Sequence, residues 1–196
     1  MNQPGNTEND GGYKEAGPGE KGRKSPALLG LKHSGKSSVA ERLSNRLSLP
    51  CLDTDRLVSH EAGCDSARET FKAVGRARFR DLEERVCSKL ARRAENERIV
   101  LATGGGLADN EEALAILSQE FYLIYLLDSE QVLYDRFMKG GRPAFLPQKN
   151  TREAWSQIYR RRDRCCRRWA DRIVDCRRRT VAEITEIAYE SFIHGD

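Results

Sequence analysis

Short apolar runs alternate along this chain with longer stretches in which apolar residues recur every three or four positions. Short, mainly apolar runs bounded by turn residues have the length and composition of buried strands. They lie at 27–30, 50–53, 98–102, 121–127 and 172–175. Helical periodicity occupies the segments at 36–48, 56–62, 66–73, 76–96, 111–118, 129–138, 151–169 and 181–192. The pattern therefore predicts five strands with helices between them.

This alternation is typical of βαβ units, in which strands run parallel and the connecting helices cover both faces of one sheet. We predict an α/β protein with three layers, α/β/α, around a central parallel sheet of five strands. Residues 1–25 are polar, with Tyr13 as their one aromatic side chain, and are predicted to be a flexible tail. Residues 26–196 form the single predicted domain. Ligands of such folds bind beyond the carboxyl ends of the strands, so residues that follow the apolar runs are candidates for chemistry.

The first apolar run leads into the segment GLKHSGKS at 30–37, and the first predicted helix follows directly. This segment matches G-x-x-x-x-G-K-[ST], the P-loop pattern, and the strand before it and the helix after it argue against a chance turn. The backbone N–H groups of such a loop and the positive N-terminus of the helix form a socket for phosphate. In such a site Lys36 would reach the β- and γ-phosphates, and the hydroxyl of Ser37 would face Mg²⁺.

Two aspartates, Asp53 and Asp55, end the second apolar run. Side chains two positions apart on a strand share one face, so both carboxylates are predicted to point toward the phosphate socket. Phosphoryl transfer needs a ligand for Mg²⁺ and a group that orients the acceptor hydroxyl, and two carboxylates can divide these tasks. Without a P-loop beside them, two solvated aspartates in a turn would be the better interpretation.

Three glycines, Gly104, Gly105 and Gly106, follow the third apolar run. Glycines let a ligand approach the backbone closely, although a flexible loop explains the pattern equally well. Because they follow a strand of the same sheet, they are expected to meet the P-loop and the two aspartates in one crevice.

Arg80, Arg142 and Arg162 are candidate ligands for an anionic substrate, because the planar guanidinium binds carboxylate and phosphate oxygens bidentately. Arg142 lies in a loop at 139–150 that contains glycine and proline, and a loop of this length between two helices is often a lid. A lid at about 137–150 would exclude water from ATP. From the pattern alone, a solvated surface residue is the better interpretation of each arginine.

The 196 residues carry a formal net charge of +4 at pH 7, but ten arginines are concentrated at 160–179. Such a run can bind nucleic acid, an acidic membrane or phosphorylated small molecules. Arginines spread around a helix are more often solvated and ion-paired, and no groove-reading motif accompanies them. We predict neither a nucleic-acid nor a membrane partner, and a basic binding module without catalysis stays open as an alternative.

The six cysteines lack the paired spacing of a zinc site and the density of a secreted disulfide framework. The longest apolar run, at 121–127, is far shorter than the ~20 residues of a membrane-spanning helix, and no signal peptide is visible. A soluble, cytoplasmic, monomeric protein with reduced thiols is expected.

In their order along the chain, these pieces resemble the shikimate kinase family. The resemblance runs from about Leu28 to about Asp175. It rests on GLKHSGKS at 30–37, DTD at 53–55, FRDLE at 79–83, ATGGG at 102–106, RP at 142–143, and Arg162 with AD at 170–171. It implies a P-loop NTPase fold of the nucleoside monophosphate kinase type. It also implies transfer of the γ-phosphate of ATP, with Mg²⁺, to the 3-hydroxyl of shikimate.

The same resemblance implies a role for each matching residue. The catalytic residues would be Lys36, Asp55 and Arg142. The Mg²⁺ ligands would be Ser37 and Asp53. The nucleotide would contact Lys32, His33, Ser34, Gly35, Lys36, Ser37, Ser38 and Arg136. Shikimate would contact Asp55, Arg80, Gly104, Gly105, Gly106 and Arg162. A helical region at about 54–80 would bind this substrate, and Glu83 would orient Arg80 through an ion pair.

The chain departs from the family pattern at three places, one of which is the absence, around Arg179 and Thr180, of the proline often found near the adenine. His33 stands where family P-loops usually have glycine, and we expect a negative φ there. The usual R-x-P-L-Y reads RDRCC at 162–166, so the helix is expected to continue unbroken. A further alternative is another small-molecule P-loop kinase, such as a gluconate kinase, which would share Lys36 and Ser37 without the paired carboxylates and arginines.

Overall fold

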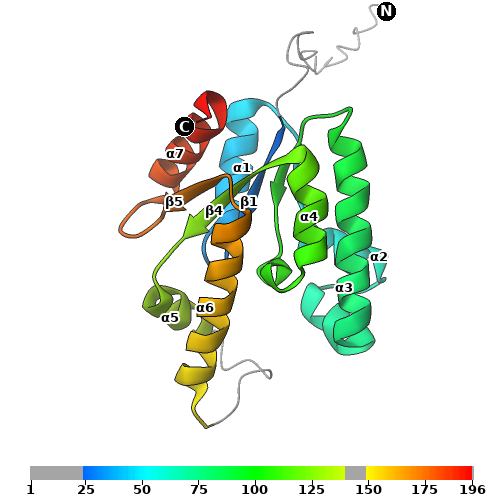
Figure 1. Cartoon of the computed structure of the whole chain (residues 1–196), viewed down its shortest axis with the longest axis vertical. Coiled ribbons are helices and arrows are strands. Elements are labelled where there is room, and N and C mark those ends of the chain that lie inside the picture. Colours follow the sequence, from blue (N-terminus) through cyan, green and yellow to red (C-terminus); the bar gives the residue numbers. More distant parts are fainter. Residues whose placement is uncertain (1–23, 140–148, 196) are drawn as a thin grey trace, which may run out of the picture.

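The strand that precedes the P-loop lies in the middle of a five-stranded parallel sheet in the computed structural model, which describes residues 24–139 and 149–195. The strands are β1 (Ser25–Leu29), β2 (Cys51–Asp53), β3 (Val100–Ala102), β4 (Phe121–Leu127) and β5 (Arg172–Asp175). Their order is β2-β3-β1-β4-β5, and every neighbouring pair is parallel. The predicted α/β/α architecture with five parallel strands is confirmed (Figure 1).

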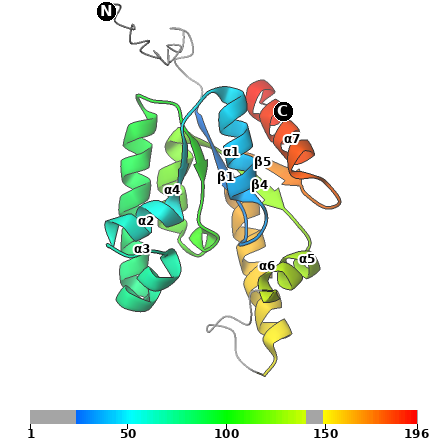
Figure 2. The ribbon, with the colours of Figure 1, turned by 180° about the vertical axis from the view of Figure 1, so that it is seen from behind.

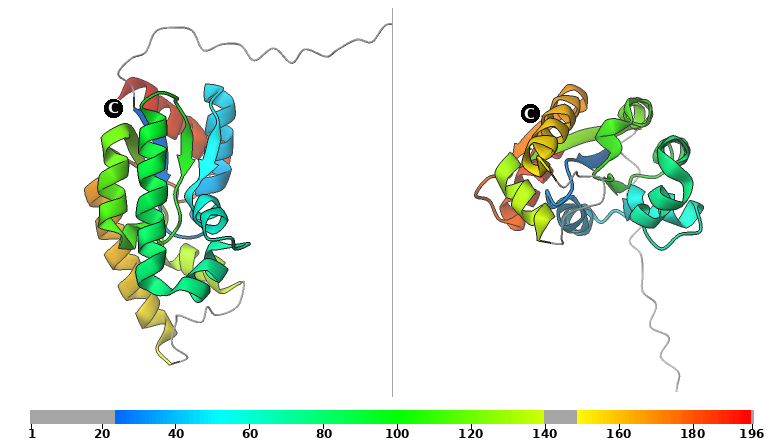
Figure 3. Two further views of the ribbon diagram at one scale, coloured as in Figure 1. Left: turned by 90° about the vertical axis from the view of Figure 1, so that its right-hand side faces the viewer. Right: turned by 90° about the horizontal axis from the view of Figure 1, so that it is seen from below.

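Helices cover both faces of this sheet (Figures 2 and 3). They are α1 (Lys36–Leu47), α2 (Thr54–Glu61), α3 (Ala67–Ala94), α4 (Glu111–Glu120), α5 (Glu130–Met138), α6 (Thr151–Trp169) and α7 (Val181–His194), with a 3₁₀ turn, η1 (Leu107–Asp109). Residues of α1 and α7 form one core with Ile124 and Leu126 of β4. Residues of α3, α4 and α6 form a second core with Leu123 and Tyr125 of the same strand. Successive side chains of β4 therefore point into opposite apolar layers, as in a sheet buried on both faces.

The predicted break between the helices at 66–73 and 76–96 lies at Gly75. The range of α3 includes two helical segments that meet at a kink at Gly75, where φ is 74° and ψ is 175°, a conformation that only glycine adopts readily. Phe71 and Phe79 pack edge to face across the break, with ring centroids 5.6 Å apart. The segment before Gly75 therefore lies against the longer helix instead of extending it.

Several boundaries differ slightly from the predictions. The strand β1 begins at Ser25, a buried residue that the sequence assigned to the tail, and β3 begins at Val100. The helix α6 continues unbroken to Trp169, as expected from the absence of proline after Arg162. Residues 1–23 and 140–148 lie outside the described residues, and so do most of the predicted tail, most of the predicted lid and Arg142. Among the helices of the described part, none has the length and apolar character needed to cross a membrane.

Candidate active site

Lys36, the lysine of the P-loop pattern, begins α1 and is buried. Its Nζ donates a hydrogen bond of 2.8 Å to the backbone oxygen of Leu31. The preceding residue, Gly35, has φ 91° and caps α1 with no side chain, so the N–H groups of the first turn face the loop. Burial lowers the pKa of Lys36 to about 8, while the carboxylates of Asp55 and Asp53 act in the opposite direction. The ammonium group of Lys36 and the N–H groups of the first turn make a positively charged socket suited to phosphate.

The backbone at His33 contradicts the predicted negative φ, since its φ is 67°. This left-handed conformation favours glycine, and histidine is one of the few other residues enriched in it. The ring of His33 packs edge to face on Phe137, with centroids 5.7 Å apart. Arg136 donates from Nη1 to the backbone oxygen of His33 at 3.1 Å and to the buried carboxylate of Asp128 at 2.9 Å. Two residues of α5 therefore hold this turn of the P-loop.

Asp53 joins three segments through its two carboxylate oxygens. Oδ1 accepts a hydrogen bond of 2.9 Å from the backbone N–H of Asp55, and Oδ2 accepts one of 3.3 Å from the hydroxyl of Ser37. Because Asp53 caps α2, that helix starts at Thr54, and Asp55 lies in its first turn and not on β2. The prediction that the two aspartates share one face of a strand is therefore wrong. Both carboxylates still lie near Lys36, whose pKa each of them raises.

The triple glycine presses against the start of α2 and against the P-loop. A Cβ added to Gly104 would lie 2.1 Å from Oδ1 of Asp55, and one added to Gly105 would lie 2.8 Å from the backbone nitrogen of Lys32. The N–H of Gly104 donates to the buried hydroxyl of Thr54 at 2.7 Å. The segments that directly follow β1, β2 and β3 thus meet, as the sequence predicted. Thr54 was not singled out, although its place between two aspartates is a signal that could have found it.

Arg162 reaches this cluster from α6, and its side chain is only 17% exposed. Its Nε and Nη2 donate to Oδ2 of Asp109 at 3.1 and 2.8 Å, and its Nη1 donates to the backbone oxygen of Gly105 at 3.1 Å. A Cβ added to Gly106 would lie 3.9 Å from Nη2. The guanidinium therefore lies over the triple glycine, and its charge lowers the pKa of Lys36, which is far from it in sequence.

Arg80 lies on α3 and pairs with Glu112 at 2.7 Å. The predicted ion pair between Arg80 and Glu83 is therefore wrong. Glu83 is buried and accepts a hydrogen bond of 3.1 Å from Nδ2 of Asn110, which also donates to the backbone oxygen of Arg80 at 3.2 Å. The buried Asn110 also caps the N-terminus of α4. This capping role could have been predicted from the sequence, because asparagine is a preferred N-cap residue.

Replacing Glu83 with glutamine is expected to stabilise the protein more at pH 8 than at pH 5. Burial raises the pKa of Glu83 from 4.5 to about 7, although its hydrogen bond from Asn110 acts in the opposite direction. A carboxyl with a raised pKa makes folding less favourable as the pH rises from 4.5 to 7, by on the order of 3 kcal/mol. Glutamine keeps the oxygen that accepts from Asn110 and carries no charge. Urea unfolding of both proteins at the two pH values measures the difference.

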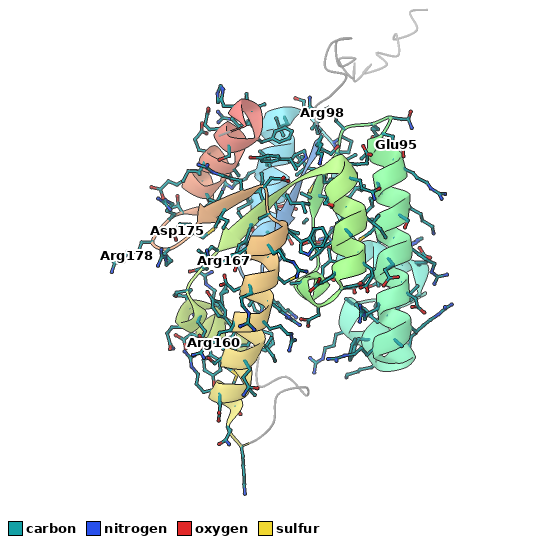
Figure 4. All side chains as sticks on the ribbon, viewed as in Figure 1. Glu95, Arg98, Arg160, Arg167, Asp175 and Arg178 are labelled. Atoms are coloured by element: carbon teal, nitrogen blue, oxygen red, sulfur yellow. The ribbon has the colours of Figure 1, made fainter. Side chains whose placement is uncertain are left out.

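Glu83 is hydrogen-bonded to the uncharged amide of Asn110. The charges of Asp55 and Asp109 also raise the pKa of Glu83, while that of Arg162 lowers it. The matched control is Glu95→Gln, at an exposed position at the end of α3 (Figure 4). That variant should show the same small change at both pH values. An equal effect of Glu83→Gln at pH 5 and pH 8 would contradict the raised pKa.

A divalent cation would find hard oxygen donors where Ser37 meets Asp53. A hydroxyl and a carboxylate 3.3 Å apart fit Mg²⁺, which usually binds one or two protein oxygens together with substrate phosphates. Within the described residues no group of three or more His, Cys, Asp and Glu side chains is arranged to hold a metal ion.

The arginine run at 160–179 lies on α6, on β5 and in the loop after it. Several members pair with neighbouring acids, such as Arg167 with Asp163 at 2.9 Å and Arg177 with Asp175 at 2.6 Å. Arg178 points away from the body of the molecule (Figure 4). Such pairs are typical of a solvated face. That this face binds no nucleic acid stays a prediction.

A family model and similar sequences identify the family to which this chain is similar. A family model described as "Shikimate kinase" matches residues 32–192. A shikimate kinase of Symbiobacterium thermophilum is 40% identical over 114 residues, which are 58% of this chain and 63% of that protein. A shikimate kinase of Thermodesulfovibrio yellowstonii is 27% identical over 163 residues, which are 83% of this chain and 91% of that protein.

The fold comparison agrees. The solved structure of a shikimate kinase from Acinetobacter baumannii in complex with shikimate superposes with a TM-score of 0.78 at 20% identity. The superposition covers 89% of this chain and 96% of that one. At this identity the likeness establishes the fold.

Proposed function

This chain belongs to the shikimate kinase family of ATP-dependent phosphotransferases, and we propose that it transfers the γ-phosphate of ATP to the 3-hydroxyl of shikimate. The products are ADP and shikimate 3-phosphate, an intermediate of aromatic amino acid biosynthesis. The observation that carries the proposal is the convergence of the P-loop, Asp55, the triple glycine and Arg162 at the carboxyl ends of adjacent strands. This arrangement offers a cation for phosphate, a carboxylate for a hydroxyl and a guanidinium for a carboxylate.

The P-loop holds the phosphates of ATP in this proposal. Lys36 exchanges its hydrogen bond to Leu31 for one to a phosphate oxygen, and the N–H groups at 32–38 surround the rest. Kinases of this family generally need a divalent metal. We propose Mg²⁺, held by Ser37 and Asp53, which supplies positive charge that offsets the negative charge of the phosphates. Arg136 would pack on the adenine, next to the turn that it already holds.

Asp55 aligns the acceptor hydroxyl and takes its proton. Burial raises the pKa of Asp55, and the carboxylate of Asp53 raises it further, while Lys36 lowers it. A buried carboxylate with a raised pKa is a stronger proton acceptor than a solvated one. Gly104 makes room beside it, because any larger residue would place its Cβ against Oδ1 of Asp55.

Two arginines bind the shikimate carboxylate in this proposal. Arg162 is already oriented over the glycines, and Arg80 would leave Glu112 to join it. Gly105 and Gly106 line the ring of the substrate, since no side chain separates their backbone from it. Arg142, which lies outside the described residues, would close over the transferring phosphate from the lid. Transfer is then mostly a matter of positioning and of charge stabilisation.

The partners are the small molecules ATP and shikimate. The six cysteines are free thiols, which supports a reducing compartment, the cytoplasm. Large apolar side chains are exposed at Phe71 and Ile173 in the described part of the chain, too few to indicate an obligate interface, and we propose a monomer.

A coupled assay of ADP release tests the function directly. The full-length chain is supplied with MgATP and with shikimate, gluconate or no acceptor. ADP release that requires shikimate is the expected result. Release with gluconate would favour the gluconate-type alternative, and nucleotide binding without release on any acceptor would favour a protein that has lost catalysis.

A further inference from the structure

Asp109, three residues after the triple glycine, lies between two neighbouring arginines of α6, Arg161 and Arg162. Its Oδ2 accepts from Nε and Nη2 of Arg162 at 3.1 and 2.8 Å. Both of its oxygens also accept from Nη2 of Arg161, at 2.9 and 3.1 Å. We propose that Asp109 is a positioning residue that fixes Arg162 in the orientation that receives the substrate carboxylate, with Arg161 restoring the positive charge of the group. This inference rests on the proposed function, and it assigns roles to two residues that the family pattern does not use.

The hydrogen bonds of Arg162 leave a defined part of it for the substrate. A guanidinium has five N–H donors. Two of them point to Asp109 and a third points to the backbone oxygen of Gly105. One N–H group remains on Nη1 and one on Nη2, and these are the donors left to bind a carboxylate. Asp109 therefore occupies one edge of the guanidinium and fixes the direction of the other.

Asp109 is itself held firmly. It ends η1, where its N–H donates to the backbone oxygen of Gly106 at 2.9 Å, and the next residue is the buried cap of α4, Asn110. An aspartate in such a turn has little freedom to follow a moving arginine. The orientation of Arg162 is therefore set before substrate binds, which reduces the conformational entropy lost on binding.

The charge of this group still attracts an anion. A carboxylate beside Arg162 alone would cancel its charge and repel the substrate. Arg161 and Arg162 together carry two positive charges against the single negative charge of Asp109, so the group is net positive. Burial would raise the pKa of Asp109, but the hydrogen bonds from Arg162 and Arg161 outweigh it and lower that pKa. Asp109 is thus ionised throughout the neutral range.

The test is steady-state kinetics of Asp109→Asn with shikimate and with ATP varied separately. Asparagine keeps one acceptor oxygen, but it carries no charge, and it must turn its N–H₂ group toward one of the two arginines, which have only donors. The charged hydrogen bonds that fix Arg162 are therefore weakened. A charged hydrogen bond is worth about tenfold or more in affinity. The KM for shikimate should therefore rise about tenfold, while kcat and the KM for ATP change less than about twofold. In an Arg162→Ala background the same substitution should add less than about twofold, because its effect acts through Arg162.

The matched control is Glu111→Gln, which removes a carboxylate two residues away that pairs with the exposed Arg168. It should leave both KM values unchanged. An unchanged or lower shikimate KM in Asp109→Asn would overturn the inference, and so would an equal rise in the KM for ATP, which indicates general damage. If the wild-type chain itself releases no ADP with shikimate, the proposed function fails first. If the wild type is active and Asp109→Asn behaves like it, only the inference fails.

Discussion

Asp55→Asn is expected to lower kcat with shikimate by about three orders of magnitude, the range in which general bases contribute. Asparagine has nearly the same shape, so it can occupy the space beside Gly104, where Oδ1 of Asp55 leaves no room for a Cβ. It cannot accept the proton of the acceptor hydroxyl. Affinity for ATP should change little, because the phosphates are held by Lys36 and by the backbone of the P-loop. Turnover is measured by ADP release, and nucleotide affinity by calorimetry with a non-hydrolysable ATP analogue.

The control for this variant is Asp65→Asn, at an exposed position after α2, which should retain wild-type turnover. Retained turnover in Asp55→Asn would remove the carboxylate from the mechanism. A simultaneous loss of ATP binding would also speak against the assigned role, because it would place Asp55 in the architecture of the P-loop. The measurement of ATP binding is therefore needed, because the carboxylate of Asp53 caps the helix on which Asp55 lies and connects the two residues.

Arg162→Ala is expected to raise the KM for shikimate by about two orders of magnitude, because truncating one partner of a buried charge pair costs about 2–5 kcal/mol. The variant removes the guanidinium that binds the substrate carboxylate. Arg161 is then the remaining cationic partner of Asp109. The KM for ATP should stay near the wild-type value, since Arg162 bonds to Gly105 and not to the P-loop. Kinetics with each substrate varied in turn separates these effects.

Arg164→Ala supplies the comparison, because Arg164 lies two residues away on the same helix and is exposed. Equal rises of the shikimate KM in both variants would mean that the general positive charge of α6 attracts the substrate, and not one directed guanidinium. A normal shikimate KM in Arg162→Ala would remove this residue from the substrate site.

Much of this fold follows from local signals. The runs at 121–127, 151–169 and 172–175 were predicted with the bounds that the structure shows. The meeting of the first three loops also followed, because parallel strands of one sheet bring their carboxyl ends to a common edge. Pattern and topology therefore suffice to predict which segments come together.

The choice of partners within the site did not follow. Glu83 is close to Arg80 along the helix, yet it bonds to Asn110, while Arg80 turns outward to Glu112. That choice of partners depends on how deeply each side chain is buried. A sequence pattern shows only which face of a helix is buried, and not the burial of each residue on it. The φ of His33 was also predicted wrongly, since the pattern does not show that Phe137 and Arg136 support a left-handed residue there. Asp109 was also missed, because its partners Arg161 and Arg162 lie on α6, which is distant in the sequence.

The central place of β1 has a consequence for how the molecule is made. Ala27 pairs with Leu101 on one side and with Leu123 on the other, so β1 has no partner until β3 and β4, which follow it in the chain, have been synthesised. A ribosome adds about 5–20 residues per second, and for several seconds the nascent chain exposes an unpaired apolar strand. Chaperones that bind such segments would meet this protein during translation. A bound nucleotide stabilises the folded form, and it can do so only after β4 has left the exit tunnel of the ribosome.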